Sequence, residues 1–415
     1  MTRAVNTLRW VGNRQRRWWI GVFLVSRIVM FWLHPTQFSE IVYSYMPFAH
    51  LWASGVMPYR EQWYEYPPAT IPLFYIPHLI DRQTHGKPWH LNYSLSYRAE
   101  LFVIDIALFW LILHTLHRWR VKPKQRALAL GTYLILGIKA HDFWFDTMDL
   151  PVAAALLFGV TAWTWGGQWL ATALKLINAP LIPLLAAVAA RREPWWRVAA
   201  KVALAGVLVW GVPIVLFRTS LSVTLVYHQL RGLQVDSVPA MLVRTANLWT
   251  KSERVIEVYK NYEMAGPVTD VVLQVVRITF PLAILNWLLV TYWRVRKREL
   301  DASAAWPAYL TLGYLLIFLL SGKVLSRPFL LWLPPLYTIL PFVSVRQQLR
   351  HLFPLTIALF STLSWAPNWQ LGVVPFPLLI GWIRTICLVW LLVEWWRLGE
   401  PKLRTLPTPL SPPRP

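Results

Sequence analysis

Acidic residues gather in one tyrosine-rich segment near the start of a chain that is otherwise strongly basic. The segment, Ser39 to Pro68, reads SEIVYSYMPFAHLWASGVMPYREQWYEYPP and contains Glu40, Glu61 and Glu65. A carboxylate beside aromatic side chains at a membrane surface suits a general base that takes a proton from a sugar hydroxyl. An interfacial amphipathic helix with an incidental carboxylate is the alternative interpretation.

A second acidic group lies between residues 139 and 149, in the sequence KAHDFWFDTMD. Carboxylate oxygens suit Mg²⁺ or Mn²⁺, and His141 could join Asp146 and Asp149 as a ligand. The spacing matches no specific metal loop, so we predict no metal site but leave a divalent cation open. A solvated turn and a second catalytic carboxylate are the other interpretations. The single cysteine, Cys387, excludes an intrachain disulfide and a cysteine-based metal site.

Two further segments carry cations suited to phosphate. In YHQLRGLQVDS, residues 227–237, His228 and Arg231 lie one helical step apart, while Gln234 and Asp236 could bind hydroxyls. The planar guanidinium of arginine grips phosphate with two parallel hydrogen bonds. An arginine that merely extends to the membrane interface would give the same pattern.

The other segment is SGKVLSRPFLLW, residues 321–332, in which Lys323 and Arg327 stand four residues apart. Two cations at an outer membrane boundary run against the usual excess of positive charge on the cytoplasmic side. A lipid-linked phosphate would explain them, and anchoring to anionic lipid headgroups is the alternative.

The elements that must position these residues are membrane helices. The chain has 415 residues, 56% of them hydrophobic, with 27 tryptophans and a formal net charge of +22. Its basic residues lie in short loops between apolar runs, which fits membrane topology and not nucleic-acid binding. We therefore predict an all-α, polytopic transmembrane helical bundle. The predicted spans are residues 18–33, 97–116, 126–138, 150–165, 198–217, 268–294, 304–321, 328–344, 352–366 and 373–396.

Basic clusters set the predicted topology, with both termini cytoplasmic in the cell membrane. Residues 67–80 are apolar but short and proline-rich, so we expect them to lie along the outer surface, and we expect residues 169–190 to form a short hairpin broken by proline. The count is then about twelve spans. We predict one membrane domain over residues 1–398, outer segments at 34–98, with interfacial helices, and at 218–267, and a disordered cytoplasmic tail at 399–415.

Four charged residues fall within apolar runs: Arg27, Asp105, Arg277 and Arg384. A charge at the centre of a membrane helix costs roughly 2.5 to 3.5 kcal/mol and usually faces the bundle interior with a partner. We expect Arg27 and Asp105 to pair.

Taken in order, these motifs resemble the GT-C superfamily of polytopic glycosyltransferases. Within it, the chain is similar to the bacterial glycosyltransferase family 87 type, which includes polyprenyl-phosphate-mannose-dependent mannosyltransferases. The resemblance rests on G-x-x-P-Y at 55–59, E-Y-P-P at 65–68, R-G-x-Q-x-D-S at 231–237, K-V-x-S at 323–326 followed by Trp332, and Lys175 ahead of a proline-broken helix. Family members usually carry Asp where this chain has Glu40, and often K-V-x-S-P-Q-Y where this chain continues with Arg327.

The resemblance implies an inverting transfer of a sugar, expected to be mannose, from a polyprenyl-phosphate donor to a hydroxyl of a glycan or glycolipid on the outer face. It implies Glu40 as the base, with Glu65 and Asp149 as the other acidic candidates. The implied substrate-binding residues are Tyr43, Tyr59, Trp63, His228, Arg231, Gln234, Asp236, Lys323, Ser326 and Arg327.

Two alternatives to an active transferase stay open. A lipid-linked sugar transporter or flippase would be expected to show internal repeats and broken helices in both halves, and the sequence has no convincing repeat. A catalytically degenerate protein of the same fold would keep the same loops.

Overall fold

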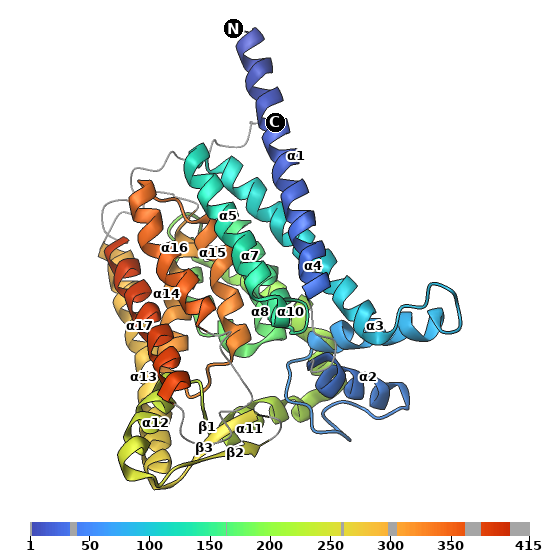
Figure 1. The fold of residues 1–415 in the computed structure, drawn as a ribbon, viewed down its shortest axis with the longest axis vertical. Helices are drawn as coiled ribbons and strands as arrows, with labels where there is room; N and C mark the ends of the chain where they lie inside the picture. Colours follow the sequence, from blue (N-terminus) through green and yellow to red (C-terminus); the bar gives the residue numbers. More distant parts are fainter. Residues whose placement is uncertain are drawn as a thin grey trace.

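The fold is a bundle of helices that carries one small sheet (Figure 1). The computed structural model describes residues 2–33, 40–162, 164–258, 261–297, 305–361 and 375–398. The predicted tail, 399–415, and the first residues of the predicted outer segment, 34–39, lie outside the described residues. The α-helices in chain order are α1 (Thr2–Leu33), α2 (Met46–Ala53), α3 (Thr70–Thr84), α4 (Tyr93–Arg118), α5 (Pro123–Lys139), α6 (His141–Trp144), α7 (Asp149–Thr161), α8 (Trp165–Leu174), α9 (Leu181–Ala189), α10 (Trp195–Phe217), α11 (Ser222–Leu230), α12 (Val238–Thr250), α13 (Pro267–Lys297), α14 (Trp306–Ser321), α15 (Leu333–Ile339), α16 (Val345–Phe360) and α17 (Pro375–Leu398).

Shorter helical turns and the strands complete the chain. The turns are η1 (Ile41–Tyr45), which is a π-helix, and the 3₁₀ segments η2 (Leu176–Asn178), η3 (Arg218–Leu221) and η4 (Arg327–Trp332). The strands are β1 (Leu233–Gln234), β2 (Arg254–Val258) and β3 (Asn261–Ala265).

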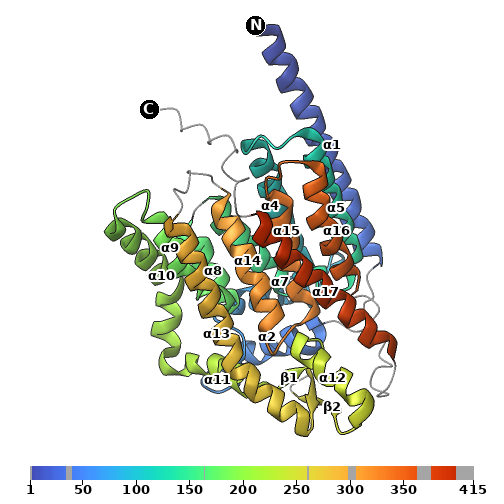
Figure 2. The same cartoon turned by 90° about the vertical axis from the view of Figure 1, so that its left-hand side faces the viewer.

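Within the described residues, four helical segments are long and apolar enough to cross a membrane: Tyr93–Arg118, Trp195–Leu230, Pro267–Lys297 and Leu378–Leu398. Only 6% of the most apolar stretch of the second segment is buried within the protein. Figure 2 shows its helix α10 at one edge of the bundle. An exposed apolar surface of this size indicates contact with lipid. The shorter apolar helices α7 and α14 lie inside the bundle, where most of their residues are buried.

The basic loops meet at one end of the bundle. Arg126 at the start of α5 donates a hydrogen bond of 2.9 Å to Gln15 in α1. The Gln125 side chain donates to the Phe342 carbonyl, and the Gln348 side chain donates to the Gln125 carbonyl. On the other half of the bundle, Arg191 donates to two carbonyls at the end of α13, and Arg294 lies 3.9 Å from the Trp396 ring centroid. The loops that the charge pattern groups together are therefore neighbours.

Two proline-rich segments depart from ordinary spans. Most of the 67–80 segment, from residue 70 onward, belongs to α3, which runs across the direction of the main bundle helices in Figure 1. The segment 169–190, for which we expected a broken hairpin, contains a break: α8 and α9 are separated by an extended Lys175 and by η2. The prediction of one continuous span at 328–344 was wrong: the 3₁₀ segment η4 is followed by the seven-residue α15. Pro328, Pro334 and Pro335 lack the amide hydrogens that a long helix uses.

The segment between α10 and α13 contains a three-stranded antiparallel sheet, which the all-helical prediction did not include. The strand order is β1-β3-β2, with Leu233 opposite Met264 and Gln234 opposite Glu263. Helix α12 covers the sheet, and Leu233, Val243 and Met264 form a small separate core there. This unit lies at the lower end of Figure 1, opposite the end where α4 leads into α5. It places Leu233 and Gln234 of the 227–237 motif in a strand.

The expected pair of Arg27 and Asp105 is confirmed in the core. Both side chains are fully buried, and Arg27 Nε lies 2.6 Å from Asp105 Oδ2. Tyr133 and Trp144 also donate hydrogen bonds to this carboxylate, at 2.9 and 3.2 Å. The guanidinium lies over the Phe23 ring at 4.7 Å. The network ties α1, α4, α5 and α6 together.

The other two charges within apolar runs behave differently from each other. Arg384 in α17 pairs with Asp236, its Nη2 lying 3.6 Å from Oδ1. Arg277 is exposed on α13, so the expectation that it faces the bundle interior was wrong. Its helix presents most side chains outward along this stretch.

Replacing Asp105 with Asn keeps the side-chain size but leaves the Arg27 charge uncompensated in the core. We expect the protein to lose about 3 to 5 kcal/mol of unfolding free energy, because removing one partner of a buried pair strands the other charge. Thermal unfolding in detergent, followed by tryptophan fluorescence, measures the loss. The matched control is Glu257→Gln, since Glu257 is exposed on β2. Equal midpoints for the two variants would contradict the role given to the pair.

Candidate active site

Lys175 is the centre of a group of charges at the end of the bundle where the sheet lies. It occupies the extended residue after α8, and its Nζ lies 2.6 Å from Asp149 Oδ1 at the start of α7. Trp332 Nε1 donates to the same oxygen at 2.9 Å. Nζ also lies 3.9 Å from the Phe329 ring centroid and 5.1 Å from that of Trp332. Asp149 therefore holds Lys175 in place, and its Oδ1 already accepts hydrogen bonds from Lys175 and Trp332.

Arg231 lies beside this pair, directly after α11. Its side chain is only 10% exposed, and it interacts electrostatically with Lys175. Its partner in an ion pair is Glu263 in β3, whose Oε1 is 3.8 Å from Arg231 Nε. Among the described residues, Arg231 Nε and Nη2 are buried without a hydrogen-bond partner. Guanidinium N–H groups removed from water and left without acceptors are costly unless an anion reaches them.

The backbone around Arg231 is fixed by Glu263. Its Oε2 accepts a hydrogen bond of 2.9 Å from Gly232 N, and a side-chain carbon at residue 232 would lie 2.4 Å from the same oxygen. A larger residue at this position would therefore have to displace the Glu263 carboxylate from its present place. Of the two residues in the R-G motif, Arg231 supplies the cation and Gly232 supplies the backbone N–H that binds Glu263.

Lys323 joins the group from the segment after α14. Its carbonyl accepts from Gln234 N at 3.0 Å, so the two cationic motifs are joined by their backbones. Its Nζ donates to the carbonyls of Gln229 and Arg231. Burial, with the neighbouring charges of Arg277 and Arg231, lowers the pKa of the Lys323 ammonium to about 8. The electrostatic influence of Lys323, Arg231 and Lys175 also reaches His228.

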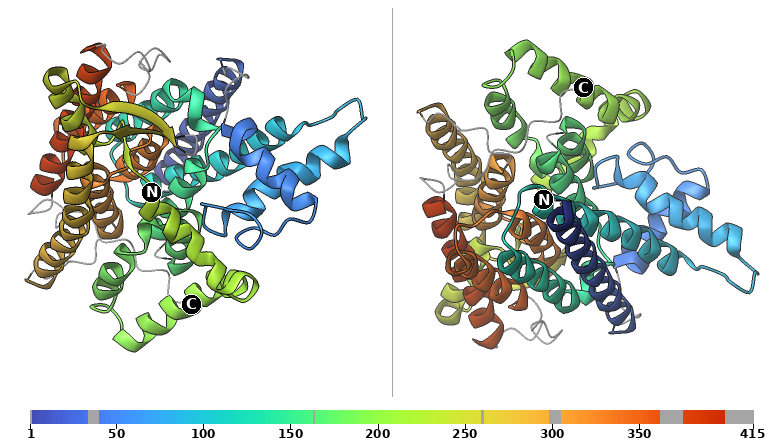
Figure 3. Two further views of the ribbon diagram at one scale, coloured as in Figure 1. Left: turned by 90° about the horizontal axis from the view of Figure 1, so that it is seen from below. Right: turned by 90° about the horizontal axis from the view of Figure 1, so that it is seen from above.

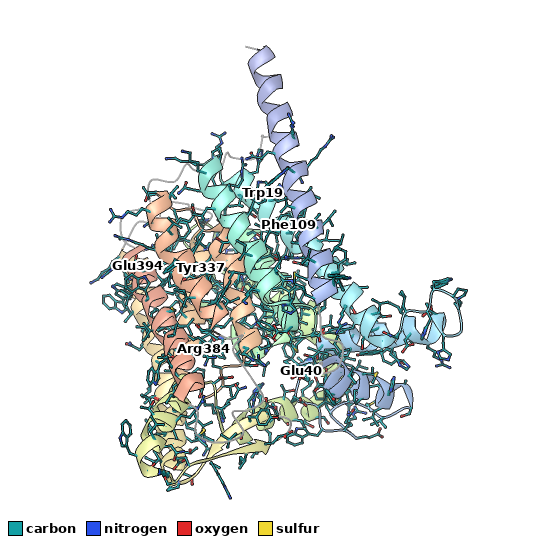
Figure 4. All side chains as sticks on the ribbon, in the orientation of Figure 1. Trp19, Glu40, Phe109, Tyr337, Arg384 and Glu394 are labelled. Carbon is teal, nitrogen blue, oxygen red and sulfur yellow. The ribbon has the colours of Figure 1, made fainter. Side chains whose placement is uncertain are left out.

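Glu40 lies within electrostatic reach of Lys175. It is exposed, directly precedes the π-helix η1 and accepts a hydrogen bond of 3.0 Å from Ser44. It interacts electrostatically with Lys175 and with Tyr66. Short π-helical turns occur often at functional sites. Figure 4 labels Glu40 beside α2, toward the same end of the protein as the small sheet.

Tyr45 and Tyr66 lie within electrostatic reach of Glu40. Tyr45 stacks on Phe74 with ring centroids 4.2 Å apart, and Tyr64 and Tyr66 pack nearby. Burial raises the pKa of the Tyr45, Tyr64 and Tyr66 hydroxyls well above the usual value. The phenols therefore stay neutral and can donate hydrogen bonds. Glu65, also half-buried, interacts electrostatically with Tyr66 and with Tyr227.

Tyr59 closes the turn that begins at Gly55. Its backbone is left-handed, with φ of 66°, which is uncommon for a side chain other than glycine or asparagine. Its hydroxyl donates to the Tyr66 carbonyl at 2.5 Å, and its ring packs on Phe217 at 4.9 Å. Tyr59 thus shapes the loop that carries Glu65.

The remaining predicted site residues are distributed around the group. Tyr43 and Trp63 are 50% and 43% exposed on the first outer segment. Gln234 is buried in β1, and Asp236 is engaged by Arg384. Ser326 is the residue before η4, and Arg327 pairs with Asp142 at 3.9 Å. Asp146 pairs with Arg98 at 2.9 Å, so Asp146 and Asp149 each hold a cation of this chain.

Three residues of the group were absent from the predicted site. Lys175 carried a signal, since it is a lone cation within an apolar, proline-broken segment. Arg277 was noted as a charge within an apolar run but not linked to Lys323. Glu263 lies in a strand that the sequence did not predict, so no local pattern assigned it a role.

Comparison with known proteins adds no relative: no protein-family model matches the chain, and no curated protein matches it.

Replacing Asp149 with Asn leaves the Lys175 ammonium buried without its counter-charge. We expect a loss of about 3 kcal/mol or more of unfolding free energy, and partial recovery when Lys175→Met is added, because the double variant removes both charges. Thermal unfolding of the two single variants and the double variant gives the coupling between the residues. Additive losses with no coupling would show that the contact carries no energy.

Proposed function

We propose that this protein is an integral membrane glycosyltransferase of the GT-C type, with about twelve spans and both termini cytoplasmic. In this proposal it moves a sugar, in the first instance mannose, from a polyprenyl-phosphate donor to a hydroxyl of a glycan or glycolipid. The reaction takes place at the outer face of the cell membrane. The family resemblance of the motifs supplies the reaction class, and the charge arrangement supports it.

The observation that carries the proposal is the unsatisfied guanidinium of Arg231. A buried Arg with free N–H donors, next to Lys175 and Lys323, is suited to a phosphate oxygen. The departing lipid phosphate gains negative charge as the glycosidic bond breaks, and preorganised cations stabilise that charge in the transition state. The exposed Arg277 lies within electrostatic reach of Lys323 and extends this cationic set toward the apolar surface of α13.

Glu40 is the proposed base. The acceptor hydroxyl attacks the anomeric carbon and gives its proton to the Glu40 carboxylate, while the sugar–phosphate bond breaks with its electron pair on the phosphate oxygen. The phosphate leaves without being protonated, so one carboxylate suffices. Tyr43 and Trp63, which are exposed near Glu40 in the sequence, offer faces on which sugar rings stack.

Replacing Glu40 with Gln keeps the size and removes the base. We expect transfer from synthetic polyprenyl-phosphate-mannose, by purified protein in lipid, to fall by about 10² to 10⁴. Glu61→Gln is the matched control, since Glu61 is exposed on the same segment and accepts a bond from Met57 N. Survival of transfer in the Glu40 variant would move the role to Glu65. No transfer by the wild type from any polyprenyl-phosphate sugar would favour a transporter or a degenerate protein.

Donor binding should weaken as the pH rises through about 8. The Lys323 ammonium loses its proton there, so a positive charge near the phosphate disappears above that pH. We expect a loss of roughly tenfold in affinity for a fluorescent polyprenyl phosphate, equivalent to about 1.4 kcal/mol. Lys323→Arg should abolish the dependence, because guanidinium stays charged. An identical pH profile in this variant would contradict the assignment.

A further inference from the structure

The segment 81–93, which links α3 to α4, brings together three groups that bind metals. Asp81 lies in the last turn of α3, His85 directly follows that helix, and His90 lies in the loop before α4. One ligand atom from each lies within 4.8 Å of the others. Asp81 Oδ1 is 2.8 Å from His90 Nε2, and the two imidazole ring centroids are 5.1 Å apart.

The loop backbone holds this arrangement. Thr84 Oγ1 bonds to both the N–H and the carbonyl of Leu91, at 3.1 and 3.3 Å, which closes the loop at its base. Lys87 N donates to the Thr84 carbonyl and His90 N to the Lys87 carbonyl, forming two consecutive turns. The second oxygen of Asp81 accepts from Tyr93 N at 3.1 Å. These bonds hold the His90 ring next to Asp81, although the two residues are nine positions apart in the sequence.

We propose that Asp81, His85 and His90 bind one divalent transition-metal ion, with Zn²⁺ as the expected occupant. Two imidazole nitrogens and one carboxylate oxygen form a donor set that Zn²⁺ prefers, with water in the fourth position. Tetrahedral bonds of about 2.0 Å place ligand atoms roughly 3.3 Å apart, so the three side chains need only small rotations.

Neighbouring charges leave room for the ion. The loop contains Lys87, whose Nζ lies 4.7 Å from the Trp89 ring centroid in a cation–π contact. Asp81 supplies one negative charge, and His85 and His90 are exposed enough to meet metal from solution. The bound ion would tie the loop to the end of α3.

This site is separate from the proposed sugar chemistry. In Figures 1 and 3 the far end of α3 projects sideways from the bundle, away from the sheet and from α7. In this proposal the metal has a structural role, because it joins the loop to the end of α3. Metal binding does not depend on the proposed transferase activity.

The test is calorimetric titration of Zn²⁺ into the purified full-length protein in detergent. We expect one ion per chain, with affinity at least about tenfold weaker in His85→Gln and in His90→Gln. Loss of a residue that only supports a metal ligand already costs about tenfold or more in affinity, so loss of a ligand should cost at least as much. The control is His117→Gln, because His117 is exposed at the end of α4, away from the cluster. Thermal midpoints without metal verify that each variant is folded.

Amide hydrogen exchange is a second measurement, because Zn²⁺ bound nonspecifically elsewhere on the surface would not change exchange in this loop. Zn²⁺ should slow amide exchange across residues 84–93 in the wild type and in His117→Gln, but not in the two loop variants. Equal Zn²⁺ affinity in all four proteins, or the absence of binding by the wild type, would overturn the proposal.

Discussion

The contact between Lys175 and Asp149 is the constraint on which the rest of this site depends. Both side chains are mostly buried, at 15% and 5% exposure, so neither can lose the other without leaving a charge away from water. The pair joins the start of α7 to the break between α8 and η2, and Trp332 adds η4 through its bond to Asp149. Three segments distant in the sequence thus meet at one oxygen. Their meeting point fixes where a ligand's negative charge can be placed.

Arg231 is positioned by a second carboxylate that does not fully satisfy it. Glu263 uses one oxygen for Gly232 N, and its other oxygen remains 3.8 Å from the guanidinium. That distance is too long for a hydrogen bond, although the opposite charges attract. The carboxylate therefore attracts the guanidinium while Nε and Nη2 lack a hydrogen-bond partner among the described residues. A group prepared in this way would not need to reorganise to bind the proposed phosphate, which is the physical advantage of a preorganised site.

The sequence predicted the fold where a single strong physical rule applies. Apolar length and basic loops located α4, α5, α10 and α13, and the cost of a lone charge in an apolar helix predicted the pairing of Arg27 with Asp105. Prolines identified the break near Lys175 but were underestimated at 328–344, where they divide the chain into η4 and α15. The small sheet was not predicted from the sequence, because β1 has two residues and β2 and β3 have five each. Strands of this length are too short to show a clear alternation of polar and apolar residues.

The candidate site was predictable as a set of motifs but not as a set of partners. Residue type and local spacing indicated Glu40, Arg231 and Lys323, and the structure brings them to one end of the bundle. Spacing along the chain does not reveal that Asp236 is engaged by Arg384, or that Arg327 lies against Asp142, because these contacts join distant segments. Lys175 could have been ranked higher, since an isolated cation in an apolar segment needs a partner.

These contacts also distinguish the carboxylates. A general base must be ionised and within reach of a hydroxyl that arrives from solution. Asp149 accepts from both Lys175 and Trp332, so a proton placed on it would weaken the contact that holds the site together. Glu65 is half-buried and interacts electrostatically with Tyr66, so it is less accessible to a hydroxyl that arrives from solution. Glu40 is exposed, and its charge is balanced at a distance by Lys175. The proposed division of roles follows: Asp149 holds the cation, and Glu40 exchanges the proton.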